Sequence, residues 1–347
     1  MTIPADSSIR VRHCPKCPLC EGEGSPRYRD LKDRLFGVEG TWNLSQCLNP
    51  SCEAIWLDPM PVEEDIPKAY SNYYTHQNLT PADSLARRIY RRAKHGYVAI
   101  RYGYYKGAVT LLDRMLGIAI FFHPGRSASI DFEAFYLDAN KGGRLLEVGC
   151  GSGVMLKTLI DRGWHAEGLD FDLSAVTNAR KKGLTVHLGS LESQEFCADT
   201  FDAIVMSHLI EHLPNPHTLV KECYRLLKPG GHLVMITPNA ESFGHRLYGA
   251  NWRGLEPPRH LIVFNQRALT QLAKASGFNQ INAFTTIRGA DEIFVASRST
   301  SVLGTYRMGG KRKRWLHVWA ATMQLWEWFF LQFKSSVGEE LVLIAKK

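Results

Sequence analysis

The stretch Arg144-Leu-Leu-Glu-Val-Gly-Cys-Gly-Ser-Gly153 decides the fold of this 347-residue chain, because a short apolar run breaks there into alternating glycines. Val154, Leu156 and Leu159 follow at helical spacing, so the stretch predicts a strand, a glycine turn and a helix. In an open α/β sheet such a turn lies outside the carboxyl end of a strand, where ligands bind. Glycine suits this position because no Cβ collides with the ligand.

The glycine spacing argues against a dinucleotide site. The turn reads Gly149-x-Gly151-x-Gly153 and the next residue is Val, so the G-x-G-x-x-G fingerprint fails. Glu147 precedes the first glycine by two residues, where its charge would repel a pyrophosphate and suit a cationic ligand. The strand-like run that follows ends in Asp170, an acid placed to bind ribose hydroxyls. These features favour a cationic nucleoside ligand.

Further motifs follow in an order that resembles the class I S-adenosylmethionine-dependent methyltransferases. Phe201–His208 is similar to the fourth strand of that family, and Leu226–Asn239 is similar to its helix end, Gly-Gly turn and fifth strand. The resemblance covers about residues 140–298. It implies an α/β fold with a Rossmann-like sheet of seven strands, and S-adenosylmethionine as cofactor. The cofactor-binding residues that it implies are Glu147, Gly149, Gly151, Gly153, Asp170, Phe171, Ser190, Leu191 and Ser207.

Apolar periodicity predicts alternating strands and helices after residue 140. We expect a parallel sheet with two final strands as its antiparallel edge. The expected strands are 144–148, 165–170, 184–188, 202–207, 231–237, 293–297 and 339–346, and the expected helices are 153–162, 172–182, 216–227 and 266–276.

Cysteines gather at the front of the chain, where Cys17 and Cys20 have the C-x-x-C spacing of a zinc site. Cys47 and Cys52 form a looser C-x4-C pair. Residues 10–61 resemble the N-terminal zinc ribbon of some bacterial methyltransferases of sugar and surface-polysaccharide pathways, whose second pair is usually C-x-x-C. The resemblance implies Zn²⁺ on these four cysteines, but the two extra residues leave open whether Cys14 replaces one ligand and whether the ribbon has lost its metal.

The chain carries a net charge of +8 that is unevenly spread. Residues 84–112 hold seven basic side chains and no acid, so a basic helical connector is expected over 62–140, before a methyltransferase domain over 141–347. Such a block indicates an anionic partner, either nucleic acid, a membrane surface or a phosphorylated substrate. Eight cysteines without a secretory signal predict reduced thiols in the cytoplasm.

An aromatic helical insertion is expected over 311–334, before the last strand. The run 315–333 is long enough to cross a membrane, but a single crossing would leave the last strand on the wrong side of it. Polar His317, Gln324, Glu327 and Gln332 fall opposite the aromatic side chains. Two alternatives remain: a helix in the inner membrane surface with Lys311–Arg314 at anionic headgroups, or packing on the protein's own core or on a second subunit.

Methyl transfer to a hydroxyl needs an aligned acceptor and a base, for which histidine is suited near pH 7. His208, Glu211 and His212 form a His-x-x-Glu-His segment after the fourth expected strand, and Arg259 and His260 close a Glu-Pro-Pro-Arg-His segment. In the resembling family both segments recur around the active site. Either His208 or His260 is the candidate base, and both could instead be scaffold. Arg259 could pair with Glu211 or bind an anionic substrate group.

We interpret the chain as a methyltransferase of a sugar, nucleotide-sugar or glycan-lipid intermediate in bacterial surface-polysaccharide biosynthesis, acting on oxygen or carbon. The substrate class follows from resemblance alone. One alternative is O-methylation of an isoprenoid quinone precursor, because those enzymes share a similar His-x-x-Glu-His segment; the ribbon argues against it. Another is a nucleic-acid-binding or RNA-modifying protein, against which the lack of an RNA-modification motif counts. The sequence leaves the oligomeric state open.

Overall fold

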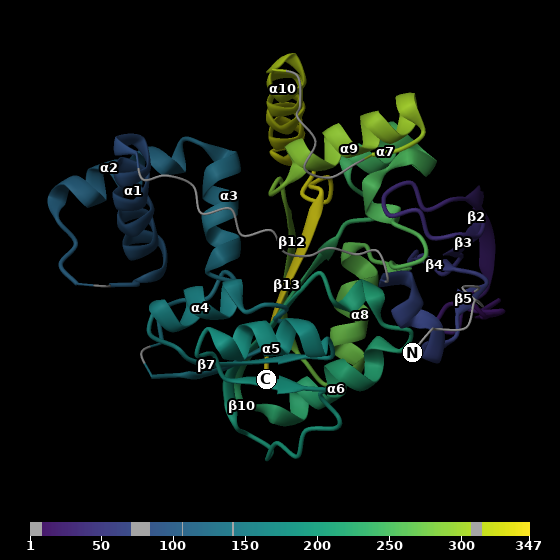
Figure 1. Cartoon of the computed structure of the whole chain (residues 1–347), viewed down its shortest axis with the longest axis horizontal. Coiled ribbons are helices and arrows are strands. Elements are labelled where there is room, and N and C mark those ends of the chain that lie inside the picture. The colour runs from purple at the N-terminus through teal and green to yellow at the C-terminus, as the bar shows by residue number, and fades with distance from the viewer. Residues whose placement is uncertain (1–8, 71–83, 106, 141, 307–313) are drawn as a thin grey trace.

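The computed structural model describes residues 9–70, 84–105, 107–140, 142–306 and 314–347. Its centre is a seven-stranded sheet in the order β12-β13-β10-β9-β6-β7-β8 (Figure 1). β6 to β10 run parallel, and β13 is antiparallel to both β10 and β12. This confirms the expected Rossmann-like sheet. Its strands are β6 (Arg144–Val148), β7 (His165–Asp170), β8 (Val186–Leu188), β9 (Phe201–Ser207), β10 (Leu227–Pro238), β12 (Gln280–Thr286) and β13 (Glu340–Lys346).

Helices cover both faces of this sheet, so its strands are buried on both sides. In β9, Ile204 and Met206 enter one core cluster while Ala203 and Val205 enter another, as the alternation of side chains along a strand requires. The chain order reverses between β6 and β9, which creates the switch point where such sheets bind ligands. The connecting helices are α4 (Val154–Asp161), α5 (Leu173–Lys181), α6 (Pro216–Leu226) and α8 (Gln266–Ala275).

The strand expected over 293–297 is wrong, because these residues lie inside helix α9 (Ala290–Leu303). The antiparallel edge strand is β12 instead. A short apolar run cannot by itself distinguish a strand from a buried helix segment. Here Gly289 and Gly304 bound the helix, and Phe294 packs against Phe243 with a ring separation of 5.9 Å.

The N-terminal ribbon shares its sheet with the large domain. Its four-stranded sheet has the order β11-β4-β3-β2, in which β11 comes from beyond residue 260, and β1 pairs separately with β5. The backbone N–H of Leu57 also donates to the carbonyl of Leu261. Trp56 is fully buried in the core cluster that covers one face of the large sheet. Residues 10–61 are therefore continuous with the large domain. The ribbon strands are β1 (Val11–Arg12), β2 (Gly24–Leu31), β3 (Trp42–Cys47), β4 (Ile55–Leu57), β5 (Met60–Pro61) and β11 (Ile262–Val263).

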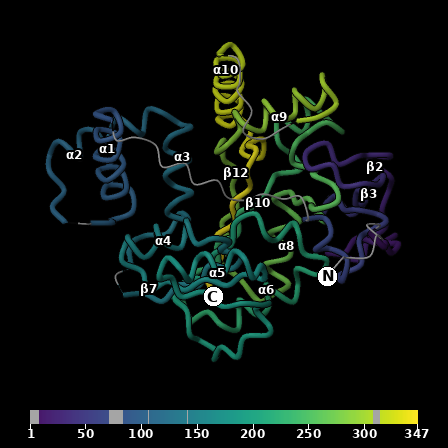
Figure 2. The backbone as a smooth tube through the Cα atoms, viewed as in Figure 1, coloured from purple at the N-terminus to yellow at the C-terminus, as the bar shows by residue number. Residues whose placement is uncertain are grey.

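Residues 62–140 contain the short helix η1 and a closely packed helix pair that stands away from the sheet (Figures 1 and 2). The backbones of the pair touch, since a Cβ on Gly96 would lie 1.7 Å from the carbonyl oxygen of Asp113. Arg92 bonds the same Asp113 side chain at 2.6 Å. These contacts fix the pair as one unit. The helices are η1 (Glu63–Tyr70), α1 (Leu85–Tyr102), α2 (Leu111–Phe121) and α3 (Pro124–Glu133).

The aromatic insertion forms helix α10 (Arg314–Leu331), whereas residues 311–313 of the expected basic cluster lie outside the described residues. Two of the four polar side chains of this helical stretch point inward: Glu327 is fully buried, and the Gln324 amide donates to the carbonyl of Ile287 at 2.9 Å, whereas His317 and Gln332 are exposed. Most aromatic side chains on the opposite side are exposed, although Trp319 and Phe330 contact α9 and α7 (Phe243–Tyr248). The expectation that the aromatic stripe packs on the protein's own core is therefore wrong for most of it. Within the described residues, no helix has both the length and the apolarity needed to cross a bilayer.

Candidate active site

A first cavity of about 400 Å³ lies beside the carboxyl ends of β6 and β7. It contains five of the nine predicted cofactor residues; the structure places the others, Glu147, Gly151, Gly153 and Ser207, outside its lining. Leu209 and Leu213 close its other side. The predicted residues that line it are Gly149, Asp170, Phe171, Ser190 and Leu191.

The glycine turn and Asp170 hold each other in place. All three glycines of the turn have positive φ, at +76°, +52° and +76°. A Cβ on Gly153 would also lie 2.3 Å from Leu184 Cδ1, so any side chain there would have to displace Leu184. Asp170 accepts hydrogen bonds from the backbone N–H groups of Gly151 at 2.7 Å and Asp172 at 2.9 Å. Its carboxylate is therefore fixed at the rim of the cavity.

Glu147 is a buried carboxyl group with an unused acceptor. Its Oε2 atom has no hydrogen-bond partner among the described residues. Burial, and then the nearby charge of Asp170, raise the pKa of Glu147 to about 8. A cationic group beside this carboxyl would stabilise its ionised form. The unpaired oxygen, the glycine turn and the fixed Asp170 together fit S-adenosylmethionine, which carries a ribose and a cationic amino group.

A second cavity of about 590 Å³ opens on the other side of the segment that follows β9. Residues in the short helix η2 (Ile210–His212) and directly beside it line both cavities, some facing one and some facing the other. Leu209 and Leu213 line the first, whereas His208 and His212 line the second. His260 also lines the second cavity. A single turn of chain therefore separates an apolar wall from a group of three histidines.

His208 lies between two buried carboxylates. Its Nδ1 atom is 3.3 Å from Glu211 Oε1, and its Nε2 atom is 3.3 Å from Glu340 Oε1. Burial alone would lower the pKa of His208, but the hydrogen bonds and charges of these two carboxylates raise it to about 9. His208 is therefore a cation at neutral pH and holds no lone pair with which to take a proton.

His212 and His260 each bond a backbone carbonyl instead of a carboxylate through Nδ1. The Nδ1–H of His212 donates to the carbonyl of Arg259 at 2.9 Å, and the Nδ1–H of His260 donates to the carbonyl of Gly254 at 2.7 Å. These bonds leave the lone pairs on the Nε2 atoms. Burial lowers the pKa of His260 to about 4, so that ring is neutral at pH 7.

Glu211 completes this group and could join the two rings in binding a metal. Its carboxylate is fully buried; burial alone would raise its pKa, but His208 and the neighbouring histidines lower it to about 2. Its Oε2 accepts from Thr237 at 2.9 Å. Glu211, His212 and His260 offer ligand atoms that all lie within 4.8 Å of one another. Two imidazoles and a carboxylate could hold a divalent cation.

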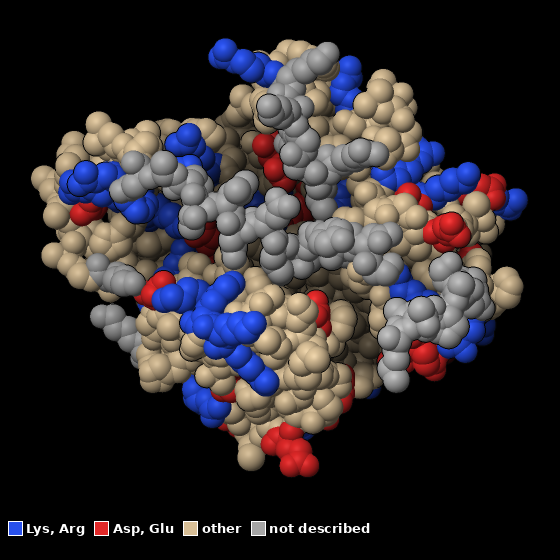
Figure 3. All heavy atoms as spheres, viewed as in Figure 1, with Lys and Arg blue, Asp and Glu red and all other residues tan. Residues whose placement is uncertain are grey.

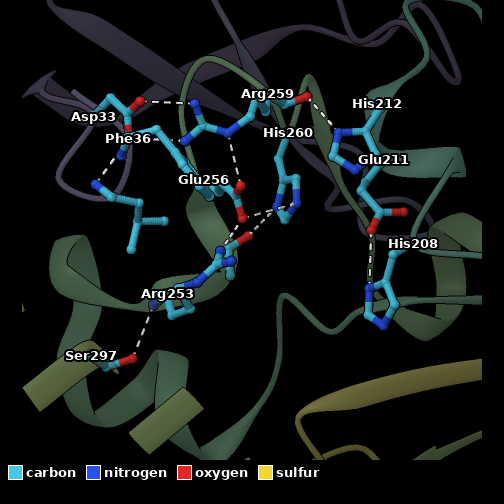
Figure 4. Close-up of polar contacts among 12 residues, drawn as sticks. Asp33, Phe36, His208, Glu211, His212, Arg253, Glu256, Arg259, His260 and Ser297 are labelled. Carbon is cyan, nitrogen blue, oxygen red and sulfur yellow. Dashed lines mark hydrogen bonds and ion pairs between the residues drawn. The ribbon is translucent and has the colours of Figure 1, made fainter. Parts of the chain in front are cut away.

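Arg259 does not join this group. Its guanidinium is buried and binds both oxygens of Asp33 at 2.8 and 2.9 Å and Glu256 at 2.8 Å (Figure 4). It also lies 4.4 Å above the ring centre of Phe36. The expected pairing with Glu211 is wrong, and Arg259 does not line the cavity, so it does not bind an anionic substrate group there. It ties the loop that carries His260 to the ribbon.

Sequence reasoning missed three acids at the site. Glu256 lies in the Glu-Pro-Pro-Arg-His segment and bonds Arg253 and Arg259, so it could have been found there. Glu340 begins the last strand and bonds Arg288 at 2.7 Å. Asp33 follows β2 and lies 226 residues from its partner. No local pattern indicates either contact.

The four predicted metal ligands meet in the ribbon. The sulfur atoms of Cys17 and Cys52 are 3.7 Å apart, and those of Cys20 and Cys47 are 3.4 Å apart. All four sulfurs lie within 4.8 Å of one another, and Cys14 is outside this group. A tetrahedral zinc with bonds of about 2.3 Å would place sulfurs about 3.8 Å apart. The geometry therefore fits one zinc ion.

Comparison with known proteins agrees with the sheet and the glycine turn. Residues 126–283 match a family model described as a methyltransferase domain. Residues 126–283 therefore form a methyltransferase domain with the Rossmann-like fold. The ribbon and α1 and α2 lie outside the matched residues.

Curated relatives of this methyltransferase chain include two ubiquinone biosynthesis O-methyltransferases. The protein from Alkalilimnicola ehrlichii is 33% identical over 132 residues, which cover 35% of this chain and 53% of the relative. The protein from Hahella chejuensis is 31% identical over 120 residues, which cover 32% and 50%. The chain thus spans about half the length of the curated relatives it matches. Their names contradict the surface-polysaccharide interpretation and favour the quinone alternative.

Among solved structures, a possible histamine N-methyltransferase from Thermotoga maritima is 21% identical with a TM-score of 0.44, covering 67% of this chain and 95% of its own. Phosphoethanolamine N-methyltransferase 2 from Haemonchus contortus is 16% identical with a TM-score of 0.45, covering 89% of this chain and 70% of its own. Likenesses this weak have no bearing on function.

Proposed function

We propose that this chain methylates an aromatic hydroxyl group of an isoprenoid quinone precursor, with S-adenosylmethionine as methyl donor. The observation that carries the proposal is the pair of cavities on opposite sides of residues 208–213. One cavity fits the cofactor, and the other is lined by histidines that can accept or donate a proton. The names of the curated relatives support the acceptor class.

The cofactor residues act by binding and orientation. Bound S-adenosylmethionine would supply an electrophilic methyl carbon, to which the acceptor oxygen would bond in line while the C–S bond breaks and the thioether leaves. Asp170 would hold the ribose, because its carboxylate is fixed at the cavity rim. Glu147 would face the cationic amino group with its unpaired oxygen. Holding both reactants in one geometry supplies much of the rate gain in such displacements.

His212 is the residue to which we assign the acceptor's proton. Its Nε2 lone pair is free because Nδ1–H is bonded to the Arg259 carbonyl. The phenolic proton would pass to Nε2 as the oxygen attacks, and the buried Glu211 carboxylate would stabilise the imidazolium that forms. His208, already a cation, would attract the developing negative charge on the oxygen.

The ribbon cysteines would hold one structural Zn²⁺. The proposal rests on the four converging sulfurs and on the small size of the segment, which has little core of its own. A zinc ion would fix β2 and β3, and through Asp33 the loop that carries His260.

The test is methyl transfer measured by mass spectrometry with phenolic quinone precursors and nucleotide sugars as competing acceptors. We expect methylation of the phenols alone. His212→Ala should lower kcat by about 10²- to 10⁴-fold, whereas His165→Ala, an exposed histidine outside both cavities, should leave it unchanged. Methylation of sugars alone would overturn the proposal.

Chelation separates the two possible roles of His212. If activity survives EDTA treatment, the proton passes to His212 as described. If activity is lost and Mg²⁺ or Mn²⁺ restores it, Glu211, His212 and His260 act as ligands, and His212 is not the base.

A further inference from the structure

Helix α2 carries a stripe of large apolar side chains that face away from its partner helix. Leu111, Met115, Ile118 and Phe122 recur every three or four residues and are 75%, 61%, 50% and 84% exposed. The opposite side of α2 is occupied by the close contact with α1. Single exposed apolar residues are ordinary, but a continuous stripe of this kind marks an interaction surface.

Helix α10 carries a second exposed stripe, which is rich in aromatic rings. Trp326 stacks on Phe330 at 6.1 Å, and Phe329 contacts Phe333 at 5.0 Å, so the rings cover one another on the surface. Trp326 remains 51% exposed and Phe333 75%. The inner side of α10 is held by Glu327, whose Oε1 accepts the backbone N–H of Glu339 at 2.7 Å. The stripe consists of Trp315, Val318, Leu325, Trp326, Phe329 and Phe333.

Both stripes adjoin the mouth of the histidine-lined cavity. Gly125 at the start of α3 and Gln324 of α10 line this cavity together. They are in contact, since a Cβ on Gly125 would lie 2.6 Å from Gln324 Oε1. Phe122 ends the α2 stripe just before this point. Figure 1 places α10 and the α1–α2 pair on the same side of the sheet, away from α6.

The surroundings of the stripes are basic. α1 exposes Arg87, Arg88 and Arg91 beside α2. Residues 84–112 contain no acid, and the first acid after them, Asp113, is buried. Figure 3 shows lysines and arginines on the α1–α2 pair and beside α10, as well as over α4 and α5. Arg314 and Lys334 flank α10 and are also exposed.

We infer that the α2 and α10 stripes dock this protein on an anionic phospholipid bilayer. Helices with an apolar face and basic flanks lie in the plane of a membrane surface, where aromatic rings enter the headgroup region. A second copy of the chain is a poorer occupant, because it would bring two basic surfaces together. The link to catalysis rests on the proposed function: an acceptor with an isoprenoid tail would reach His212 from the bilayer through the cavity between α3 and α10.

Vesicle flotation tests the surface without any methyl transfer. The full chain should float with vesicles of phosphatidylcholine and phosphatidylglycerol at low salt and stay behind with phosphatidylcholine alone. Met115→Ser/Phe122→Ser and Trp326→Ser/Phe333→Ser should each weaken binding roughly tenfold or more. Leu48→Ser/Leu173→Ser is the matched control, since both side chains are about as exposed but lie on the ribbon and α5.

The two variant pairs should melt within a few degrees of the wild type, because the replaced side chains are exposed. Failure of the wild type to float with anionic vesicles overturns the inference. Equal loss in the control pair also overturns it. A third contrary result is a wild-type dimer that the α2 or α10 variant dissociates, which would assign the stripes to a second copy. His212→Ala should bind vesicles normally, so failure of the proposed function would leave this test intact.

Discussion

Asp33→Asn should loosen the loop that carries His260 and leave the cofactor cavity intact. The wild-type carboxylate binds Arg259 through two bonds of 2.8 and 2.9 Å, and both side chains are almost completely buried. Asparagine keeps the size of the side chain but removes its charge. Arg259 would then retain Glu256 as its only charged partner among the described residues.

The magnitude follows from the burial of the pair. Removing one partner of a buried ion pair typically costs 3–5 kcal/mol, because the other charge stays in a medium of low polarity. Glu256 still compensates part of the Arg259 charge. We therefore expect a loss of about 3 kcal/mol in the free energy of unfolding.

Urea unfolding at neutral pH measures this loss, and steady-state kinetics measures its effect on the site. The KM for the acceptor should rise, while the dissociation constant of the cofactor should stay constant, because Asp33 and Arg259 do not line the cofactor cavity. The matched control is Asp161→Asn, whose partner Lys157 is exposed. That change should cost at most about 0.5 kcal/mol.

The Asp33–Arg259 ion pair should also make the stability of the protein depend on pH in the acidic range. Burial alone would raise the pKa of Asp33, but Arg259 and three backbone N–H groups lower it below its ordinary value. Its contribution to stability is therefore present above the unfolded pKa of about 3.9 and is lost as the pH falls further. A loss below about 1 kcal/mol at neutral pH, together with an unchanged acceptor KM, would refute the reasoning.

Three further changes test other buried groups. Cys17→Ser should reduce zinc from about one ion per chain to none by elemental analysis; a metal-free wild type would contradict the ribbon site. Glu147 has its pKa raised to about 8, so cofactor affinity by calorimetry should rise up to about tenfold per pH unit between pH 6 and 8, and Glu147→Gln should remove this dependence. Burial and the charge of Glu339 raise the pKa of Glu327, so its contribution to stability is present at low pH and is lost as the pH rises. The melting temperature of Glu327→Gln should therefore fall less steeply than that of the wild type as the pH rises above about 4.3, the unfolded pKa of glutamate; identical profiles would exclude this role.

The parts of the fold that depend on local pattern could be predicted from the sequence. The glycine turn, the acid at the end of β7 and the histidine segment after β9 each follow from short spacings whose geometry the backbone enforces. The cysteine ligands were predicted for the same reason, although the longer second pair left Cys14 as an alternative. The structure brings together the two cysteine pairs, which are separated in the chain by 26 intervening residues.

The parts that depend on distant partners could not be predicted. Arg259 was matched to Glu211 because both lie near the same site, but its bonds go to Asp33, on the ribbon. No local pattern predicts which side of α10 packs against the rest of the protein. Periodicity places Glu327 on the side opposite the aromatic rings, but it does not show which of the two sides is buried. The backbone N–H of Glu339, placed by the last strand, decides that Glu327 turns inward.

The sharing of β11 between ribbon and catalytic domain has a consequence for how this enzyme can be dissected. A fragment that begins at residue 141 would leave β11 without its partner β4 and would expose the surface that Trp56 now covers. It would also lack Asp33, so the buried guanidinium of Arg259 would lose one of its two carboxylate partners. The methyltransferase domain of this chain is therefore not autonomous, and a domain swap between relatives would have to move residues 10–61 and 253–263 together.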